Sequence, residues 1–265
     1  IFEQYDKQVQ SRIHTETGLA DAGVMAPFNS EKYPEEIRNV GIALSTDHNP
    51  RYGLIDPYWG GINAVVESMR NVASVGATPH ALSDCLCFGN PEKPHQMWEF
   101  VESVRGVADA CHAITLKDNP NHATPIIAGN VSFYNESKSG AIPPSPILSC
   151  LGRFKDVNKA VPGHFQKLDS VVLMIGERKN ELGGSVYYSL YGEMGANVPK
   201  PNLEEVKNQI FALTDCIDGG LVLSCHDISD GGVASALAEM TFGNDIGCDI
   251  NIDSNLLNEK LLWSE

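Results

Sequence analysis

Strand-like stretches alternate with amphipathic helical stretches along the whole chain, and this order constrains the fold more than any other feature. The expected strands cover residues 39–46, 79–88, 125–132, 146–154, 169–176 and 221–225. The expected helices cover residues 62–76, 95–114, 204–220 and 233–243. Polar stretches over 47–61, 116–124 and 135–145 are expected to be loops. The alternation predicts an α/β fold or interleaved α+β layers.

The chain divides into two parts near residue 155. Its 265 residues suit one large domain or two ordinary ones. We expect domains over 1–155 and 156–265, with the second one truncated. The run 169–176, "DSVVLMIG", is almost continuously apolar. That pattern is typical of a strand covered on both faces, so a second, helix-covered sheet is expected after the boundary.

Composition excludes several classes of function. Apolar residues make up 42% of the chain, which supports a sizeable core, and the net charge is −15. Such an excess of acid argues against nucleic-acid binding. No apolar run is long enough to span a membrane, and the first residues lack the pattern of a signal peptide. The chain does not start with Met, so we expect a fragment or a processed product.

Seven cysteines bear on the redox environment. The count is odd, and the C-x-C pair Cys85 and Cys87 has no second pair or neighbouring histidine that would indicate zinc. We therefore expect reduced, mostly buried thiols in a cytosolic protein.

Four polar clusters, residues 46–51, 84–92, 129–136 and 226–232, follow or end predicted strands, where α/β proteins place ligands. Their carboxylates suit magnesium, and their glycines allow close approach to phosphate. The four aspartates are Asp47, Asp84, Asp227 and Asp230. Each cluster alone also has a purely structural interpretation: turns at 46–51 and 84–92, a strand-to-loop transition at 129–136, and a helix cap at 226–232. Neither of the two commonest phosphate-loop motifs is present. The coincidence of four clusters nevertheless favours a magnesium–nucleotide site.

Several longer blocks resemble the C-terminal half of phosphoribosylformylglycinamidine synthase, the synthetase subunit of purine biosynthesis. They run in the same order as in that family and cover nearly the whole chain. The most specific are "DCLCFGNPE" at 84–92, "PIIAGNVSFYNES" at 125–137 and "SCHDISDGGVASALAEM" at 224–240. Position 87 is Cys where the family usually has Asn, so a polar role there is open. Aminoimidazole ribonucleotide synthetase and its relatives share the implied fold.

The resemblance implies a specific reaction and site. The family is an ATP-dependent carbon–nitrogen ligase that converts formylglycinamide ribonucleotide and glutamine-derived ammonia to formylglycinamidine ribonucleotide through an iminophosphate. Asp84 and Gly129 match positions that contact ATP, Asn130 matches a magnesium ligand, and Ser132 matches a substrate contact. Asp227 and Asp47 are weaker metal candidates. The resemblance assigns no catalytic residue to this half.

The resemblance also implies partners. The mixed sheet of one half is expected to pair with that of the other half into a barrel, with the active site shared between them. The N-terminal half and a glutaminase subunit or domain are the implied protein partners. Alone, this half is expected to be inactive, cytoplasmic and homodimeric. Two alternatives stay open: a non-catalytic nucleotide-binding scaffold, and a related enzyme of the aminoimidazole ribonucleotide synthetase type.

Overall fold

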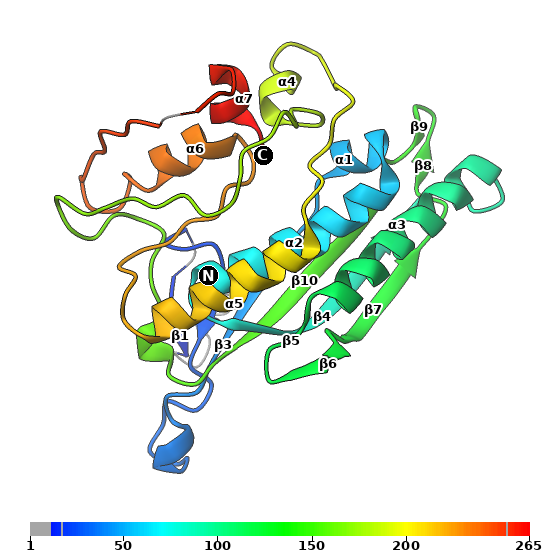
Figure 1. The fold of residues 1–265 in the computed structure, drawn as a ribbon. Coiled ribbons are helices and arrows are strands. Elements are labelled where there is room, and N and C mark those ends of the chain that lie inside the picture. The colour runs from blue at the N-terminus through cyan, green and yellow to red at the C-terminus, as the bar shows by residue number, and fades with distance from the viewer. Residues whose placement is uncertain (1–11, 17, 253) are drawn as a thin grey trace.

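The structure is a computed structural model that describes residues 12–16, 18–252 and 254–265. The start of the expected first domain, residues 1–11, lies outside the described residues. A six-stranded sheet in the order β1-β2-β3-β10-β4-β7 organises the fold (Figure 1). Its strands are β1 Ile13–Thr15, β2 Gly23–Met25, β3 Gly41–Asp47, β4 Thr78–Cys87, β7 Ile126–Ser132 and β10 Ser145–Phe154.

The sheet is mixed. Strand β10 runs antiparallel to both β3 and β4, and β7 runs parallel to β4 and forms one edge. The expected strands over 39–46, 79–88, 125–132 and 146–154 are therefore confirmed. The sheet is open, with β1 and β7 as its outer strands in the described part of the chain. The expected barrel is not formed by this chain alone.

Helices α2 Pro57–Ser74, α3 Pro94–Ala113 and α5 Leu203–Asp218 lie together on one face of the sheet (Figure 1). Side chains from that face and from α2 form the main core, with Val65, Met69 and Val72 of α2 and Leu148 of β10 fully buried. Alternate residues of the strands point to the opposite face, where Leu44 is exposed and others are partly buried. One face of the sheet is therefore covered and the other is open.

Helices α2 and α3 approach each other through two glycines. A Cβ atom added to Gly61 would lie 2.3 Å from the Ser103 carbonyl oxygen, and one added to Gly106 would lie 2.0 Å from the Tyr58 carbonyl oxygen. Because real Cβ atoms do not approach that closely, the observed packing requires glycine at both positions.

Residues 47–61 contain helices instead of the expected loop. Helix α1 Pro50–Ile55 and helix α2 each begin with a proline directly after a polar cap. The Asn49 side chain accepts a hydrogen bond from Arg51 N at 3.0 Å, and the Asp56 side chain accepts from Tyr58 N and Trp59 N. Asn-Pro and Asp-Pro are helix-start signals as well as turn signals, and the sequence prediction weighed only the second meaning.

Two other predicted loops contain short hairpins. Residues 116–124 hold most of the pair β5 Thr115–Leu116 and β6 Asn119–Ala123, and residues 135–145 hold β8 Glu136–Ser137 and β9 Gly140–Ala141. The remaining helices are α4 Val186–Ser189, α6 Gly232–Glu239 and α7 Asn258–Trp263, with 3-10 turns at Glu35–Ile37 and Val157–Lys159.

The prediction of strands over 169–176 and 221–225 is wrong for this structure. Neither segment has strand hydrogen bonding, and Val171, Leu173 and Leu221 are each more than three-quarters exposed. An apolar run becomes a strand only where a neighbouring strand pairs with its backbone, and no described segment does so here. The second sheet that these strands would have built is consequently missing from the described residues.

Candidate functional site

One transverse row of the sheet connects the residues of interest. Asp47 on β3 pairs with Leu148 on β10, Leu148 also pairs with Asp84 on β4, and Asp84 pairs with Gly129 on β7. Directly paired residues share a face of the sheet, so all four point toward the helix-covered side. Two of the predicted site residues, Asp84 and Gly129, are therefore brought together, and Asp47 lies two strands away.

Asp84 and Gly129 are in very close contact. A Cβ atom on residue 129 would lie 2.0 Å from Asp84 Oδ1, so the carboxylate occupies the space that any side chain would need. Burial raises the pKa of Asp84, and a hydrogen bond from the Asn130 backbone N–H opposes that shift. The lack of a side chain at Gly129 thus leaves room for the Asp84 carboxylate against the β7 backbone.

Asn130 and Ser132 belong to the other face of β7. Because side chains alternate along a strand, both point away from Asp84 and toward the open face, where Asn130 is exposed. In register they lie opposite Cys85 and Cys87 of β4. The structure therefore brings the backbone of Asn130 to Asp84 but directs the Asn130 and Ser132 side chains to the opposite side of the sheet.

The polar cluster at 84–92 contacts the cluster at 129–136. Phe88 N donates to Ser132 O at 2.9 Å, Tyr134 N donates to Gly89 O at 2.9 Å, and the Asn135 side chain donates to Phe88 O at 3.1 Å. These bonds extend the β4–β7 pairing past the strand ends. The two clusters therefore form one continuous polar edge.

The clusters at 46–51 and 226–232 form a second site. Asn71 Nδ2 of α2 donates to Asp47 Oδ1 at 3.0 Å, and Asp227 lies close enough to raise the pKa of Asp47. Burial is the larger cause, and burial and the Asp227 charge together raise the pKa of Asp47 to about 6. Hydrogen bonds from Asn71 and Ser45 oppose this rise. Burial, followed by the Asp47 charge, raises the pKa of Glu67 on α2 to about 8. These acids are therefore crowded and poorly solvated.

Three oxygens of this second site are buried without a hydrogen-bond partner among the described residues: Asp47 Oδ2, Asn71 Oδ1 and Asp227 Oδ2. Buried acceptors are rarely left unpaired in proteins. Oxygen atoms gathered from two aspartates and an asparagine, with a further glutamate beside them, are the ligand type that hard divalent cations prefer. The donor set therefore fits magnesium.

An open cavity lies beside Glu67, with a volume of about 970 Å³ that includes space open to solvent. Its wall also carries basic groups, two of which, Arg70 Nε and Arg178 Nε, are buried and lack a hydrogen-bond partner in the described part of the chain. Burial and the neighbouring Arg70 charge lower the pKa of Arg178. Among the residues that line the cavity are His48, Glu67, Arg70, Arg178, Asp230 and Glu265.

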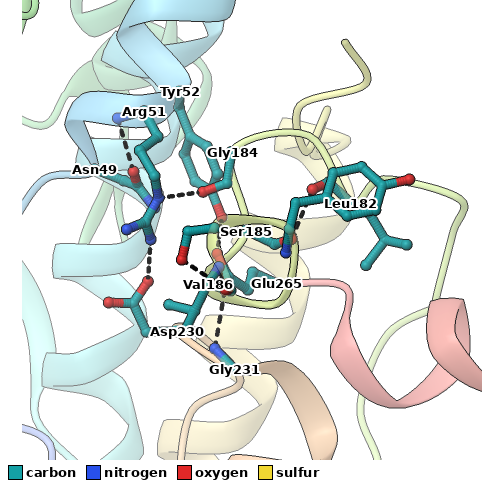
Figure 2. Close-up of polar contacts among 12 residues, drawn as sticks. Asn49, Arg51, Tyr52, Leu182, Gly184, Ser185, Val186, Asp230, Gly231 and Glu265 are labelled. Atoms are coloured by element: carbon teal, nitrogen blue, oxygen red, sulfur yellow. Dashed lines mark hydrogen bonds and ion pairs between the residues drawn. The ribbon is translucent and has the colours of Figure 1, made fainter. Parts of the chain in front are cut away.

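Arg51 and Glu265 connect chain segments that lie around this cavity (Figure 2). Arg51 Nη2 lies 3.2 Å from Asp230 Oδ1, and Arg51 Nε donates to Gly184 O. Glu265 Oε1 accepts from Val186 N at 2.7 Å and Gly231 N at 2.9 Å, and Tyr52 Oη donates to Glu265 Oε2 at 2.9 Å. One carboxylate therefore holds α1, α4 and the start of α6 together.

His226 has partners that its sequence context does not indicate. Its Nδ1 lies 2.9 Å from Asp21 Oδ1 and 3.4 Å from Asp227 Oδ1, and its Nε2 lies 2.9 Å from Glu239 Oε2. Burial alone would lower the pKa of His226, but the Asp21 and Asp227 carboxylates outweigh it and raise the pKa to about 10. The imidazolium therefore anchors one side of Asp227.

Sequence reasoning missed Asn71, Glu67, Asp21 and Glu265 as site residues. The signal for the first two was available: Glu67 and Asn71 stand four residues apart on a predicted helix, so they share one face. Asp21 and Glu265 come from sequence-distant segments, and no local pattern points to them.

The fold and the acid-lined site define a member of a known class of α/β proteins. Residues 20–154 match the model described as AIR synthase related protein, N-terminal domain, and residues 168–263 match AIR synthase related protein, C-terminal domain. The chain therefore belongs to the AIR synthase related protein family.

Curated relatives are named phosphoribosylformylglycinamidine synthase subunit PurL. The protein of that name from Methanothrix thermoacetophila is 47% identical over 268 residues, which cover 100% of this chain and 34% of the relative. The one from Methanocaldococcus jannaschii is 39% identical over 277 residues, which cover 100% of this chain and 36% of the relative. The chain thus spans about a third of the length of these relatives.

Solved structures share the fold. The structure of T. maritima PurL complexed with FGAR has a TM-score of 0.53 at 22% identity and covers 90% of this chain and 32% of that one. The HypE–HypF complex has a TM-score of 0.52 at 19% identity and covers 81% of this chain and 68% of that one. At these identities the likeness supports the fold alone. None of the helices in the described ranges is long and apolar enough to cross a membrane.

Proposed function

We propose that this chain is part of an ATP-dependent ligase that converts formylglycinamide ribonucleotide to formylglycinamidine ribonucleotide, with ammonia derived from glutamine. The names of the curated relatives support the reaction, and their greater length supports a shared site to which this chain contributes one part. We further propose domains over 1–155 and 156–265, an absence of activity in the isolated chain, and a cytoplasmic location, which its free cysteines support.

The contact between Asp84 and Gly129 is the observation that carries the proposal. A residue without a side chain lies beside a partly buried carboxylate, three residues before the carboxyl ends of the parallel strands β4 and β7. Such strand ends are common nucleotide sites, and a bare backbone there can approach a phosphate. In this proposal Asp84 and Gly129 contact ATP, Asn130 binds magnesium and Ser132 contacts the substrate.

A second magnesium position is proposed at Asp47, Asn71 and Asp227, with Glu67 beside them. The three unpartnered oxygens described above are the reason. Magnesium bound there would neutralise phosphate charge. The chain's own residues orient the site: His226 holds Asp227, and the Asn71 amide fixes one oxygen of Asp47.

The proposed reaction depends mainly on the alignment of the two reactants. Transfer of a phosphoryl group to an amide oxygen requires two reactants in line and stabilisation of the charge that develops. A rigid strand pair provides fixed positions for Asp84 and the Gly129 backbone. Residues on the open face, including Asn130 and Ser132, would meet the remainder of the site on another subunit or segment.

The open face of the sheet is the proposed contact for that remainder. Leu44 and Met25 are exposed there, and a row of partly buried residues lies between them and the β7 edge. In the complete enzyme an N-terminal half would cover this face, and a glutaminase subunit or domain would deliver ammonia. The isolated chain would instead pair with a second copy.

The proposal is tested in a chimeric enzyme. The matched third of the M. thermoacetophila relative is replaced by this chain, and ADP release is measured with ammonia as the nitrogen donor. We expect release that depends on formylglycinamide ribonucleotide, reduced about 10²–10³-fold by Asp84→Asn. Asp249→Asn, an exposed aspartate, is the matched control and should leave the rate unchanged.

Two outcomes would count against the proposal. Full activity of the Asp84→Asn exchange protein would remove the site assignment and favour the non-catalytic scaffold. ADP release with formylglycinamidine ribonucleotide but not with formylglycinamide ribonucleotide would favour an enzyme of the aminoimidazole ribonucleotide synthetase type.

A further inference from the structure

Strand β4 carries two cysteines side by side on the open face of the sheet. Cys85 and Cys87 are two residues apart, so the pleat of the strand directs both to the same side. Their Sγ atoms lie 3.7 Å apart, and both side chains are partly exposed. Of the seven cysteines, only Cys111 and Cys150 are buried, so the expectation of mostly buried thiols is wrong. The pair is an accessible dithiol.

The strand opposes closure of this dithiol into a disulfide. Two residues of an extended strand span about 6.6–6.8 Å between Cα atoms, which is the long end of the range for disulfides. Strand β4 is paired on both sides at this point: Cys87 lies opposite Ser145 of β10 and Ser132 of β7. Shortening the strand would break pairing with both neighbours, so an S–S bond is disfavoured.

The same spacing suits two ligands of one ion. Thiolates bound tetrahedrally at the zinc–sulfur distance of about 2.3 Å lie about 3.8 Å from each other, and the longer Cd–S bond widens that separation slightly. The observed separation of 3.7 Å therefore needs only a small adjustment. We propose that Cys85 and Cys87 form a two-thiolate chelating site for thiophilic ions, the class that includes Cd²⁺ and trivalent arsenic. Magnesium, a hard cation, does not compete for thiolates.

Proton balance follows from the thiol chemistry. Burial and the adjacent Cys85 raise the pKa of Cys87, which favours the thiol form of that residue. Binding of one Cd²⁺ to two thiol groups forms two Cd–S bonds and releases two protons. Reaction with an organic arsenoxide forms two As–S bonds and releases the oxygen as one molecule of water.

The position of the dithiol indicates that a bound ion would inhibit the proposed ligase. Cys85 and Cys87 lie in register with Asn130 and Ser132 on the same face of the sheet. An ion on the two sulfurs would therefore stand over the edge assigned above to magnesium and substrate, and would inhibit the ligase. This consequence rests on the proposed function, whereas the binding itself does not.

Phenylarsine oxide tests the site, because stable adducts need two neighbouring thiols. Intact mass and a count of the remaining thiols should show one arsenic and two lost thiols per chain. Cys85→Ser and Cys87→Ser should each abolish the stable adduct and weaken Cd²⁺ binding, followed by the thiolate charge-transfer band, by about 100-fold. Cys216→Ser, a partly exposed cysteine outside the pair, should behave as the parent.

The outcomes separate cleanly. Unchanged arsenic and Cd²⁺ binding in both single variants would overturn the proposal. Cys87→Asn serves as a second variant with a different side chain, and circular dichroism verifies that each variant is folded. If arsenic binds as expected while the activity of the exchange protein is unaffected, the site stands and only its link to the proposed function is lost.

Discussion

Asp84 and Gly129 lie opposite each other on the parallel strands β4 and β7, so close that a Cβ atom on residue 129 would come within 2.0 Å of Asp84 Oδ1. Gly129→Ala should therefore displace the carboxylate or separate the strands. We expect a loss of about 1–3 kcal/mol in the free energy of unfolding, as for other overpacked sites. Chemical denaturation of the isolated chain measures it.

A rescue experiment isolates that contact. Gly129→Ala combined with Asp84→Ala should recover most of the lost stability, because the group that clashes is removed. Gly247→Ala is the matched control, since nothing lies within 4 Å of a Cβ atom at that position. A double variant as unstable as Gly129→Ala alone would show that the carboxylate is not what the alanine meets.

The crossing of α2 and α3 predicts a second overpacking effect. Gly106→Ala should lower the free energy of unfolding by about 1–3 kcal/mol, because the new methyl would meet the Tyr58 carbonyl oxygen. Helix propensity alone favours alanine by about 1 kcal/mol, so a net loss has to come from packing. Val101→Ala, at an exposed position of α3, should change stability by less than about 0.5 kcal/mol in a thermal melt. A stabilised Gly106→Ala protein would contradict the observed crossing.

The pKa shifts of Asp47 and Glu67 predict an unusual pH dependence. Both pKa values are raised, to about 6 and about 8, so the folded state binds protons more tightly than the unfolded state. In the presence of a chelator, stability should therefore fall as pH rises from about 5 to about 8. Magnesium should restore it at the upper end, which unfolding midpoints across that range would reveal.

Substitution separates the two acids from the background. At pH 8 without magnesium, Glu67→Gln should raise the free energy of unfolding by about 1–3 kcal/mol, because a buried charge is removed. Asp47→Asn should abolish the gain in stability on adding magnesium, whereas Asp249→Asn should keep it. An increase in the stability of the unsubstituted chain between pH 5 and 8 would contradict this prediction.

The Glu265 carboxylate predicts a local effect. Glu265→Ala removes the acceptor of Val186 N, Gly231 N and Tyr52 Oη, leaving three donors without their partner. Hydrogen exchange should accelerate in residues 184–190 and 229–236, with a global loss of about 1–3 kcal/mol. Glu193→Ala, an exposed glutamate, should leave both segments as protected as before. Equal protection in the Glu265→Ala protein would mean that the contacts do not hold the helices.

The open sheet face predicts self-association of the isolated chain. Sedimentation at micromolar concentration should show a dimer, and Leu44→Glu should convert it to a monomer because Leu44 is exposed on that face. Leu168→Glu changes another exposed leucine, outside the strands of the sheet, and should leave the dimer intact. A monomeric parent chain would end the idea.

Much of the first sheet could be predicted from the sequence, because its strands and helices carry strong local periodicity. Strand β4 and helix α3 begin and end within one residue of the predicted ranges. The expected strand over 169–176 failed for a different reason: its apolar content was read correctly, but strand structure also needs a partner, and pairing is not a local property. The predicted loop over 47–61 failed because its two prolines mark helix starts.

The site was only partly predictable. Asp84 and Gly129 stand next to each other because β4 and β7 pair in parallel, which the motifs at both strand ends suggested but could not align. Asn71 reaches Asp47 from a helix, and Glu265 reaches Tyr52 across 213 residues of sequence. Such contacts depend on tertiary packing, which single-sequence patterns do not encode.

The row of paired residues Asp47, Leu148 and Asp84 also fixes the distance between the backbones of the two aspartates. Only β10 separates the two aspartates, so their backbones are held about two strand spacings apart, on the order of 9.6 Å. Loop insertions or domain motions cannot stretch this span without breaking ladders on both sides of β10. The sheet thus keeps the two aspartates at a fixed separation, and any ligand that contacts both must be long enough to span it.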